Sequence, residues 1–242
     1  MFSILQKEIN SFLNSLIAYI VITVFLMGIG LFMWVFPDSN VLDYGFADMS
    51  TLFNMTPYVF LFLIPAITMR SFAEEKKAGT MELLFTHPVT DYQIILGKYI
   101  SSLLLVLFAL IPTLLYYYSV YQLGSPKGNI DSAGVFGSYI GLFMLASVFT
   151  AIGIFSSSIT ENQIVAFIVS IFLCFIIFTG FSSLGTLAFW GQSSDLINSF
   201  GIEYHYQSLS KGLIDSRDIT YFLSVIFAMI VSTQLVLGSR KW

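Results

Sequence analysis

The residues best suited to chemistry gather in one segment, Arg70–Lys98. Its motifs, in order, are Glu74-Glu75-Lys76-Lys77, Gly79-Thr80-Met81-Glu82-Leu83-Leu84, Pro88-Val89 and Gly97-Lys98. A Gly-Lys pair could belong to a phosphate-binding loop, which also needs a glycine five positions before that pair and a serine or threonine after it. Tyr92 and Tyr99 occupy those two positions. We therefore predict that the chain does not itself bind ATP.

Other reactive residue types do not form a recognisable site. Cys174 is the single cysteine, and the two histidines, His87 and His205, are far apart in sequence, so neither a disulfide within the chain nor a Cys/His metal cluster is expected. Ser156-Ser157-Ser158 has no histidine near it, although a nucleophilic serine needs a base. We predict no catalytic residue, no metal site and no cofactor.

The local pattern of this segment predicts two short helices. The run Glu74–Lys77 is expected to end a helix that continues from an apolar span, with Gly79 at its C-terminal cap. Thr80 would cap a second helix with Glu82 in its first turn, and Pro88 would stop that helix. A short helix held between two charged helix ends suits the docking of a partner. The alternative is a solvated connector.

Composition places the segment in a membrane protein. Of the 242 residues, 57% are hydrophobic and only 10% are charged, the net charge is -4, and the mean hydropathy is +0.85. Soluble domains carry roughly 25% charged residues. A soluble enzyme and a disordered chain are therefore excluded, and the absence of a basic surface argues against nucleic-acid binding. We predict an all-α membrane protein, residues 1–242 forming a single domain.

Six uncharged apolar segments are long enough, or nearly so, to cross about 30 Å of hydrocarbon. They are Leu16–Phe36, Leu52–Met69, Tyr99–Tyr121, Val135–Ser157, Gln163–Ala188 and Ile219–Leu237. In the short second segment, Pro57 suits a first helical turn. Pro65 is expected to kink that helix because it removes a backbone donor.

Basic residues indicate the orientation of the spans. With the N-terminus in the cytoplasm, seven of the ten basic residues lie inside: Lys7, Arg70, Lys76, Lys77, Lys98, Arg240 and Lys241. The other three lie outside: Lys127, Lys211 and Arg217. Both termini are then cytoplasmic, residues 70–98 form a cytoplasmic loop, and residues 189–218 form an outer loop.

The sequence also predicts the structure of three further segments. Apolar residues recur every three or four positions over residues 1–15, which predicts an amphipathic helix lying in the membrane interface. The alternative is a plain extension of the first span. Gly137 and Gly141 form a face of small residues, expected to pack inside the bundle rather than in a dimer. The small, polar segment Gly180–Gln192 predicts a break of the fifth span into a re-entrant hairpin.

The motifs of residues 70–98 resemble the coupling loop of ABC-2 type ATP-binding-cassette transporter permeases. That resemblance implies a type V exporter-like permease of six transmembrane helices in a bacterial inner membrane. It also implies a separate ATP-binding subunit, and a second permease subunit that is identical or different. The ATPase-coupling residues that it implies are Glu74, Glu75, Lys76, Lys77, Gly79, Thr80, Glu82, Leu83 and Pro88.

Within that family the chain is most similar to the gliding-motility permease subunits of Bacteroidota. The segment Glu203–Asp218 carries this likeness, with its Lys211-Gly212-Leu213-Ile214-Asp215-Ser216-Arg217-Asp218 tail. The resemblance implies export linked to gliding motility. The alternative is a membrane scaffold that anchors a motility or assembly machine without moving a substrate. The substrate itself cannot be read from uncharged spans.

Overall fold

The computed structural model describes residues 2–43, 45–81, 90–186 and 194–239, and every regular element among them is helical. The all-α prediction is confirmed. The elements are α1 Phe2–Leu13, α2 Leu16–Trp34, α3 Ser50–Thr68, α4 Ala73–Lys77, α6 Asp91–Leu110, a 3-10 turn Ile111–Thr113, α7 Leu114–Leu123, α8 Ser132–Ile159, α9 Gln163–Phe175, a π-turn Ile176–Gly180, α10 Phe181–Gly185, α11 Ser194–Asn198, α12 Ile202–Leu209 and α13 Ser216–Gly238.

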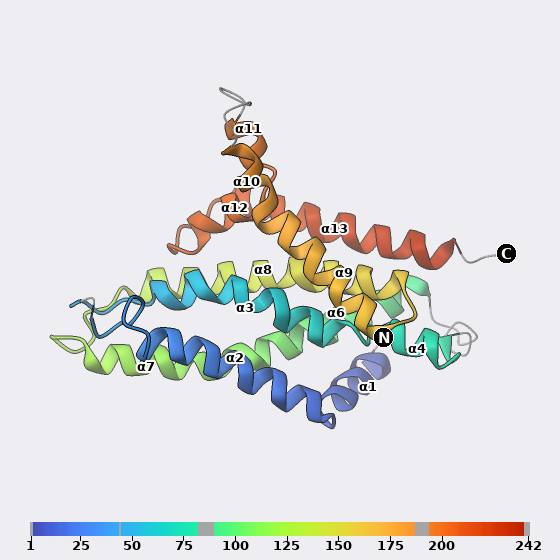
Figure 1. Ribbon diagram of the computed structural model, residues 1–242, viewed down its shortest axis with the longest axis horizontal. Coiled ribbons are helices and arrows are strands. Elements are labelled where there is room, and N and C mark those ends of the chain that lie inside the picture. Colours follow the sequence, from blue (N-terminus) through green and yellow to red (C-terminus); the bar gives the residue numbers. More distant parts are fainter. Residues whose placement is uncertain (1, 44, 82–89, 187–193, 240–242) are drawn as a thin grey trace.

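Among the described residues, six helical segments are long and apolar enough to cross a membrane, in agreement with the six predicted spans. Most of them run along the long axis of the molecule, while α9 and α10 lean away from it (Figure 1). The central helix is α8, which packs against α3, α6, α9 and α13. By contrast, α2, α9 and α13 expose large apolar side chains such as Val24, Phe172 and Phe227. These faces need lipid or another apolar surface to cover them.

Glycines allow the helices around α8 to approach closely. A Cβ atom added at Gly153 would lie 2.1 Å from the Thr68 hydroxyl of α3. One added at Gly141 would lie 2.7 Å from Leu209 of α12, and one at Gly137 would lie 2.6 Å from the Gly212 carbonyl. The face formed by Gly137 and Gly141 therefore packs inside this chain, as the sequence predicted.

Pro57 does not lie in the first turn of its helix, so that prediction is wrong. It is the eighth residue of α3, because the helix starts at Ser50. A proline at this depth leaves the carbonyl of residue 53, one turn earlier, without its helical donor. The hydroxyl of Tyr206 donates to that carbonyl at 2.7 Å. A residue 153 positions away in the chain thus satisfies the acceptor that the proline frees.

The third span begins well before the predicted Tyr99. Thr90 caps α6 at its N-terminus, and Thr90 and Gln93 form a reciprocal capping box, which satisfies backbone donors at the helix start. Lys98 therefore lies inside α6, and its side chain is 1% exposed. The predicted end of the loop at Lys98 is accordingly wrong, because residues 91–98 already belong to α6.

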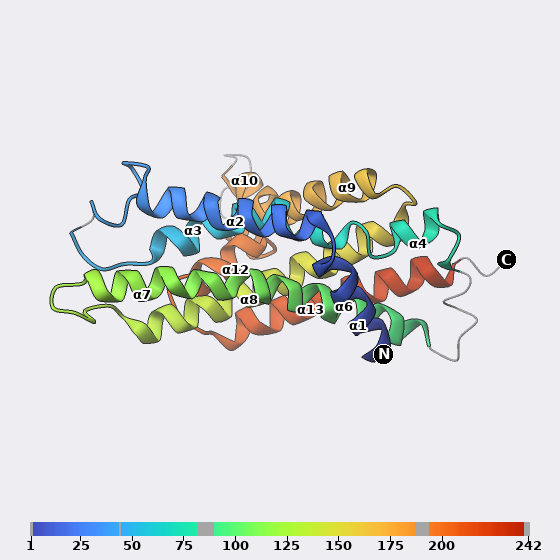
Figure 2. The same cartoon turned by 90° about the horizontal axis from the view of Figure 1, so that it is seen from below.

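The N-terminal helix is a separate element. Ser15 caps α2 with its side chain, which ends the alternative that α1 simply extends the first span. Figure 2 shows α1 lying across the bundle instead of along it. Its buried side packs on α6 and carries Glu8 together with Phe12, one turn further on. This crosswise placement is the geometry that a helix in the membrane interface adopts.

The predicted break in the fifth span falls where α9 gives way to the π-turn and to α10. A Cβ atom added at Gly185 of α10 would lie 1.9 Å from Asn198 of α11, and one at Gly201 would lie 3.1 Å from Phe181. These contacts run antiparallel, so α10 and α11 form a hairpin. The rest of the predicted segment, residues 187–192, lies outside the described residues. Within the predicted outer loop 189–218, most described residues are helical, in α11 and α12.

Candidate functional site

The short helix α4 lies within the candidate coupling segment, and its C-terminal end has a defined geometry. Gly79 adopts φ +67°, the left-handed conformation that glycine reaches without strain. The Gly79 amide donates to the Lys76 carbonyl at 3.1 Å, and the Thr80 amide donates to the Glu75 carbonyl at 3.0 Å. This pair of bonds is a Schellman motif, which satisfies carbonyls left free at a helix end. The predicted capping role of Gly79 is confirmed.

The N-terminal end of α4 is capped by another helix. The hydroxyl of Ser157, near the end of α8, accepts from the backbone amides of Phe72 at 3.0 Å and Ala73 at 3.1 Å. The same hydroxyl donates to the Met69 carbonyl at 3.0 Å. An oxygen from a distant part of the chain thus does what an N-cap side chain normally does locally. In addition, Lys76 of α4 donates to the Ser158 carbonyl.

Replacing Ser157 with alanine should destabilise the protein by about 1–3 kcal/mol, because two buried amides would lose their acceptor. We expect a lower unfolding midpoint in detergent and faster tryptic cleavage after Lys76 and Lys77. Ser156→Ala is the matched control, because the Ser156 hydroxyl donates only to the Ile152 carbonyl of its own helix. Equal effects of the two substitutions would contradict the capping role.

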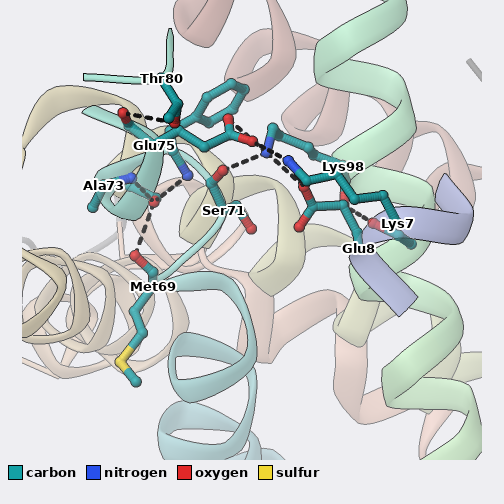
Figure 3. A network of polar contacts seen from close by, with 11 residues as sticks. Lys7, Glu8, Met69, Ser71, Ala73, Glu75, Thr80 and Lys98 are labelled. Carbon is teal, nitrogen blue, oxygen red and sulfur yellow. Dashed lines mark hydrogen bonds and ion pairs between the residues drawn. The ribbon is translucent and has the colours of Figure 1, made fainter. Parts of the chain in front are cut away.

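A buried ion cluster ties α4 to α1 and α6 (Figure 3). Lys98 of α6 lies 2.8 Å from the Glu8 carboxylate of α1 and 2.9 Å from the Glu75 carboxylate of α4. It also donates to the Ser71 carbonyl at 2.6 Å, and its ammonium lies 5.1 Å from the centre of the Phe72 ring. With four favourable neighbours, the buried charge of Lys98 is compensated. We call Lys7, Glu8, Glu75 and Lys98 the ion cluster.

The second cation of the cluster is Lys7, whose ammonium lies 2.8 Å from Glu75. Partial burial acts to lower the pKa of Lys7, but the hydrogen bond and the charge of Glu75 outweigh it and leave the pKa raised above 10.5. Because the pKa of Lys7 is higher in the folded than in the unfolded protein, its protonation contributes stability, fully so below pH 10.5. That contribution is lost only as the pH rises through the pKa of Lys7 in the folded protein. The Lys7–Glu75 contact therefore persists throughout the neutral range.

Comparison with protein-family models supplies the identification. The model described as ABC-2 family transporter protein matches residues 2–239. The chain belongs to the ABC-2 transporter family. A search of curated proteins finds no match.

As an ABC-2 permease, the chain is a multi-pass membrane protein with six spans. It is the membrane subunit of a transporter and not itself the ATPase, and the family implies an ATP-binding partner. The short-helix motif that suggested this family from sequence is only partly described by the structure. Glu82, Leu83 and Pro88 lie outside the described residues.

The predicted coupling residues of the permease fall into two sets, one that points into the bundle and one that is exposed. Glu75 is 9% exposed and points into the ion cluster, and Lys76 reaches back to α8. Glu74, Lys77, Gly79 and Thr80 are exposed. The exposed set can meet a partner directly, whereas Glu75 and Lys76 hold α4 in place.

Sequence reasoning missed four residues that hold α4: Lys7, Glu8, Lys98 and Ser157. A signal existed for Glu8, which stands four residues from both Ile4 and Phe12 and hence lies in the apolar stripe of α1. A carboxylate in an apolar stripe indicates a buried cation nearby. Nothing in the local sequence distinguishes Ser157 from its two serine neighbours.

A second polar cluster lies between α12 and α13. His205 places Nδ1 2.8 Å from Asp218 and Nε2 2.9 Å from the Ser199 carbonyl. Ser208 donates to the other oxygen of Asp218. A nucleophilic serine would instead bond to the histidine. This cluster therefore ties α12 to α13 and lacks the geometry of a catalytic triad. Among the described residues, no three His, Cys, Asp or Glu side chains gather to hold a metal.

Proposed function

We propose that this permease couples ATP hydrolysis in a separate subunit to export of a substrate, with α4 transmitting the motion. The observation that carries the proposal is the attachment of α4 to three other elements. Ser157 and Ser158 join it to α8, Lys98 joins it to α6, and Lys7 joins it to α1. A displacement of α4 cannot leave those helices unaffected.

The direction of transmission follows from the exposed and buried sides of α4. An ATP-binding subunit would contact the exposed Glu74, Lys77, Gly79 and Thr80 and the segment that continues through Glu82, Leu83 and Pro88. The ion cluster on the opposite side would pass the displacement to α6, and Ser157 would pass it to α8. Since α6 and α8 pack together, the displacement would reach both of these spans.

We also propose the setting of this activity. The chain would lie in a bacterial inner membrane with both termini in the cytoplasm, because most of its basic residues fall on that side. The two ends of the described chain lie toward the α4 end of the bundle, which supports this orientation (Figure 2). The exposed apolar faces of α9 and α13 leave room for a second permease subunit. The likeness of segment Glu203–Asp218 supports a link to gliding motility.

The proposal is tested by purifying the tagged permease in mild detergent and identifying the subunits that remain bound. We expect an ATPase with phosphate-binding motifs. Exchanging charges in the double variant Glu74→Lys/Lys77→Glu should release it, because the variant keeps the net charge but inverts the exposed face of α4. Lys127→Glu, an exposed charge at the opposite end of the bundle, should leave the complex intact.

Recovery of the intact permease without any ATPase would contradict the coupling proposal and favour a scaffold that anchors a motility or assembly machine. Retention of the ATPase by the charge-exchanged variant would show that α4 does not form the docking surface.

A further inference from the structure

A cavity opens beside the ion cluster, between α1, the turn that joins α3 to α4, and α6. Its volume is about 270 Å³. One wall is charged and includes Arg70 and Glu74, and another is apolar and includes Phe12, Ile67 and Leu105. The cavity is thus amphipathic, unlike a site for a small hydrophilic ion, which would have no use for the apolar wall.

Arg70 is the cation of this cavity that has no counter-ion. Lys7 forms an ion pair with Glu75, and Lys98 forms ion pairs with Glu8 and Glu75. Within the described part of the chain, Arg70 forms no ion pair, and its Nε atom is buried without a hydrogen-bond partner. A guanidinium carries five donors and matches the oxygens of phosphate or carboxylate groups. Leaving a buried donor unpaired is costly, so Arg70 is poised for an anionic oxygen.

The position of the cavity indicates the source of that oxygen. Arg70 is the first charged residue after the apolar helix α3, and Leu105 lies in the apolar part of α6 beyond Lys98. The cavity therefore spans the level at which apolar surface gives way to charge. In a bilayer, phospholipid phosphates lie at this boundary, with acyl chains on its apolar side. The crosswise helix α1 lies at the same level.

We propose that this cavity binds the headgroup of a zwitterionic phospholipid of the cytoplasmic leaflet, with its phosphate on Arg70. Glu74 also lines the cavity and forms no ion pair within 4 Å among the described residues. Its carboxylate favours a headgroup that carries an ammonium beside the phosphate. A net anionic headgroup would instead face the uncompensated carboxylate. Arg70 thus selects lipids that carry a phosphate. Glu74 selects, among those, lipids with an ethanolamine headgroup.

The test uses the purified full-length permease without its partners, so it is independent of the proposed coupling. Delipidated protein is titrated with dioleoyl phosphatidylethanolamine, dioleoyl phosphatidylglycerol, dioleoylglycerol and inorganic phosphate, and bound molecules are counted by native mass spectrometry. We expect one tightly bound phosphatidylethanolamine and weaker phosphatidylglycerol. Arg70→Gln should weaken binding of phosphatidylethanolamine by about tenfold or more, as for loss of a hydrogen bond to a charged group.

Two further variants sharpen the test. Lys77→Gln removes an exposed basic residue that does not line the cavity, and it should leave lipid binding unchanged. Glu74→Gln should abolish the preference for phosphatidylethanolamine over phosphatidylglycerol, which tests the site even if the Arg70 variant does not fold.

Three results would overturn the proposal. Unchanged lipid binding in folded Arg70→Gln would exclude Arg70 as the phosphate ligand. Equal binding of dioleoylglycerol would show that no headgroup is recognised. Inorganic phosphate that binds and is not displaced by phospholipid would assign the cavity to a soluble anion.

Discussion

Replacing Lys98 with methionine will destabilise the permease by about 3–5 kcal/mol, the cost of removing one partner from a buried ion pair. Methionine fills a similar volume, so the loss comes from the carboxylates of Glu8 and Glu75, which would lose the buried cation that they share and keep only the more exposed Lys7, at 3.9 Å and 2.8 Å. The Ser71 carbonyl would also lose its donor. The measurement is the free energy of unfolding in mixed micelles, followed by helical circular dichroism as the fraction of denaturing detergent rises.

Two controls separate this cost from a general effect of removing a lysine. Lys77→Met removes an exposed lysine from α4 and should change stability by no more than about 0.5 kcal/mol. The double variant Lys98→Met/Glu75→Leu should recover part of the loss, because it also removes the more buried of the two carboxylates that Lys98 neutralises. Additive losses in the double variant would contradict the proposed pairing of Lys98 with Glu75.

The second large effect is expected at Gly79. A valine there must hold φ near the +67° of the native turn, which costs about 1–2 kcal/mol for a residue with a Cβ atom and more for a β-branched one. That strain lowers the population of the native helix end by a factor of about 5–30. Because α4 itself is fixed at its other end by Ser157, the strain falls on the chain that leaves α4 toward residues 82–89.

If the coupling proposal is correct, Gly79→Val will lower ATP hydrolysis by the reconstituted transporter several-fold while the permease still inserts and folds. The matched control is Gly28→Ala, in the middle of α2, where an added Cβ meets no atom within 4 Å. That control should hydrolyse ATP at the native rate. Native activity in the Gly79 variant would remove α4 from the coupling path.

The two predictions differ in what they disturb. Lys98 holds α4 against the rest of the bundle, so its loss is measured first as stability. Gly79 sets the direction of the chain beyond α4, so its replacement is measured first as activity. Glu75 combines both roles, since it belongs to the motif and is also buried in the ion cluster. A variant of Glu75 would therefore lose stability in addition to the loss of coupling that the proposal predicts.

The sequence by itself determined the features that depend on local patterns. Apolar runs of about 20 residues have one favourable place, the hydrocarbon core, and so the six spans were predictable. The cap at Gly79 followed from a residue type that reaches the left-handed conformation without strain. The amphipathic repeat of α1 predicted a helix distinct in character from the spans.

Tertiary structure decided which charges are buried and what holds α4. Lys98 is separated by 90 residues from Glu8, and Ser157 by 85 residues from Phe72. No local pattern records such pairings, because they depend on how close-packed helices bring distant side chains together. The same holds for Tyr206, which reaches the carbonyl freed by Pro57. Sequence could therefore point to the segment that we propose as the docking surface, while only the packed bundle shows how that segment is attached to the spans.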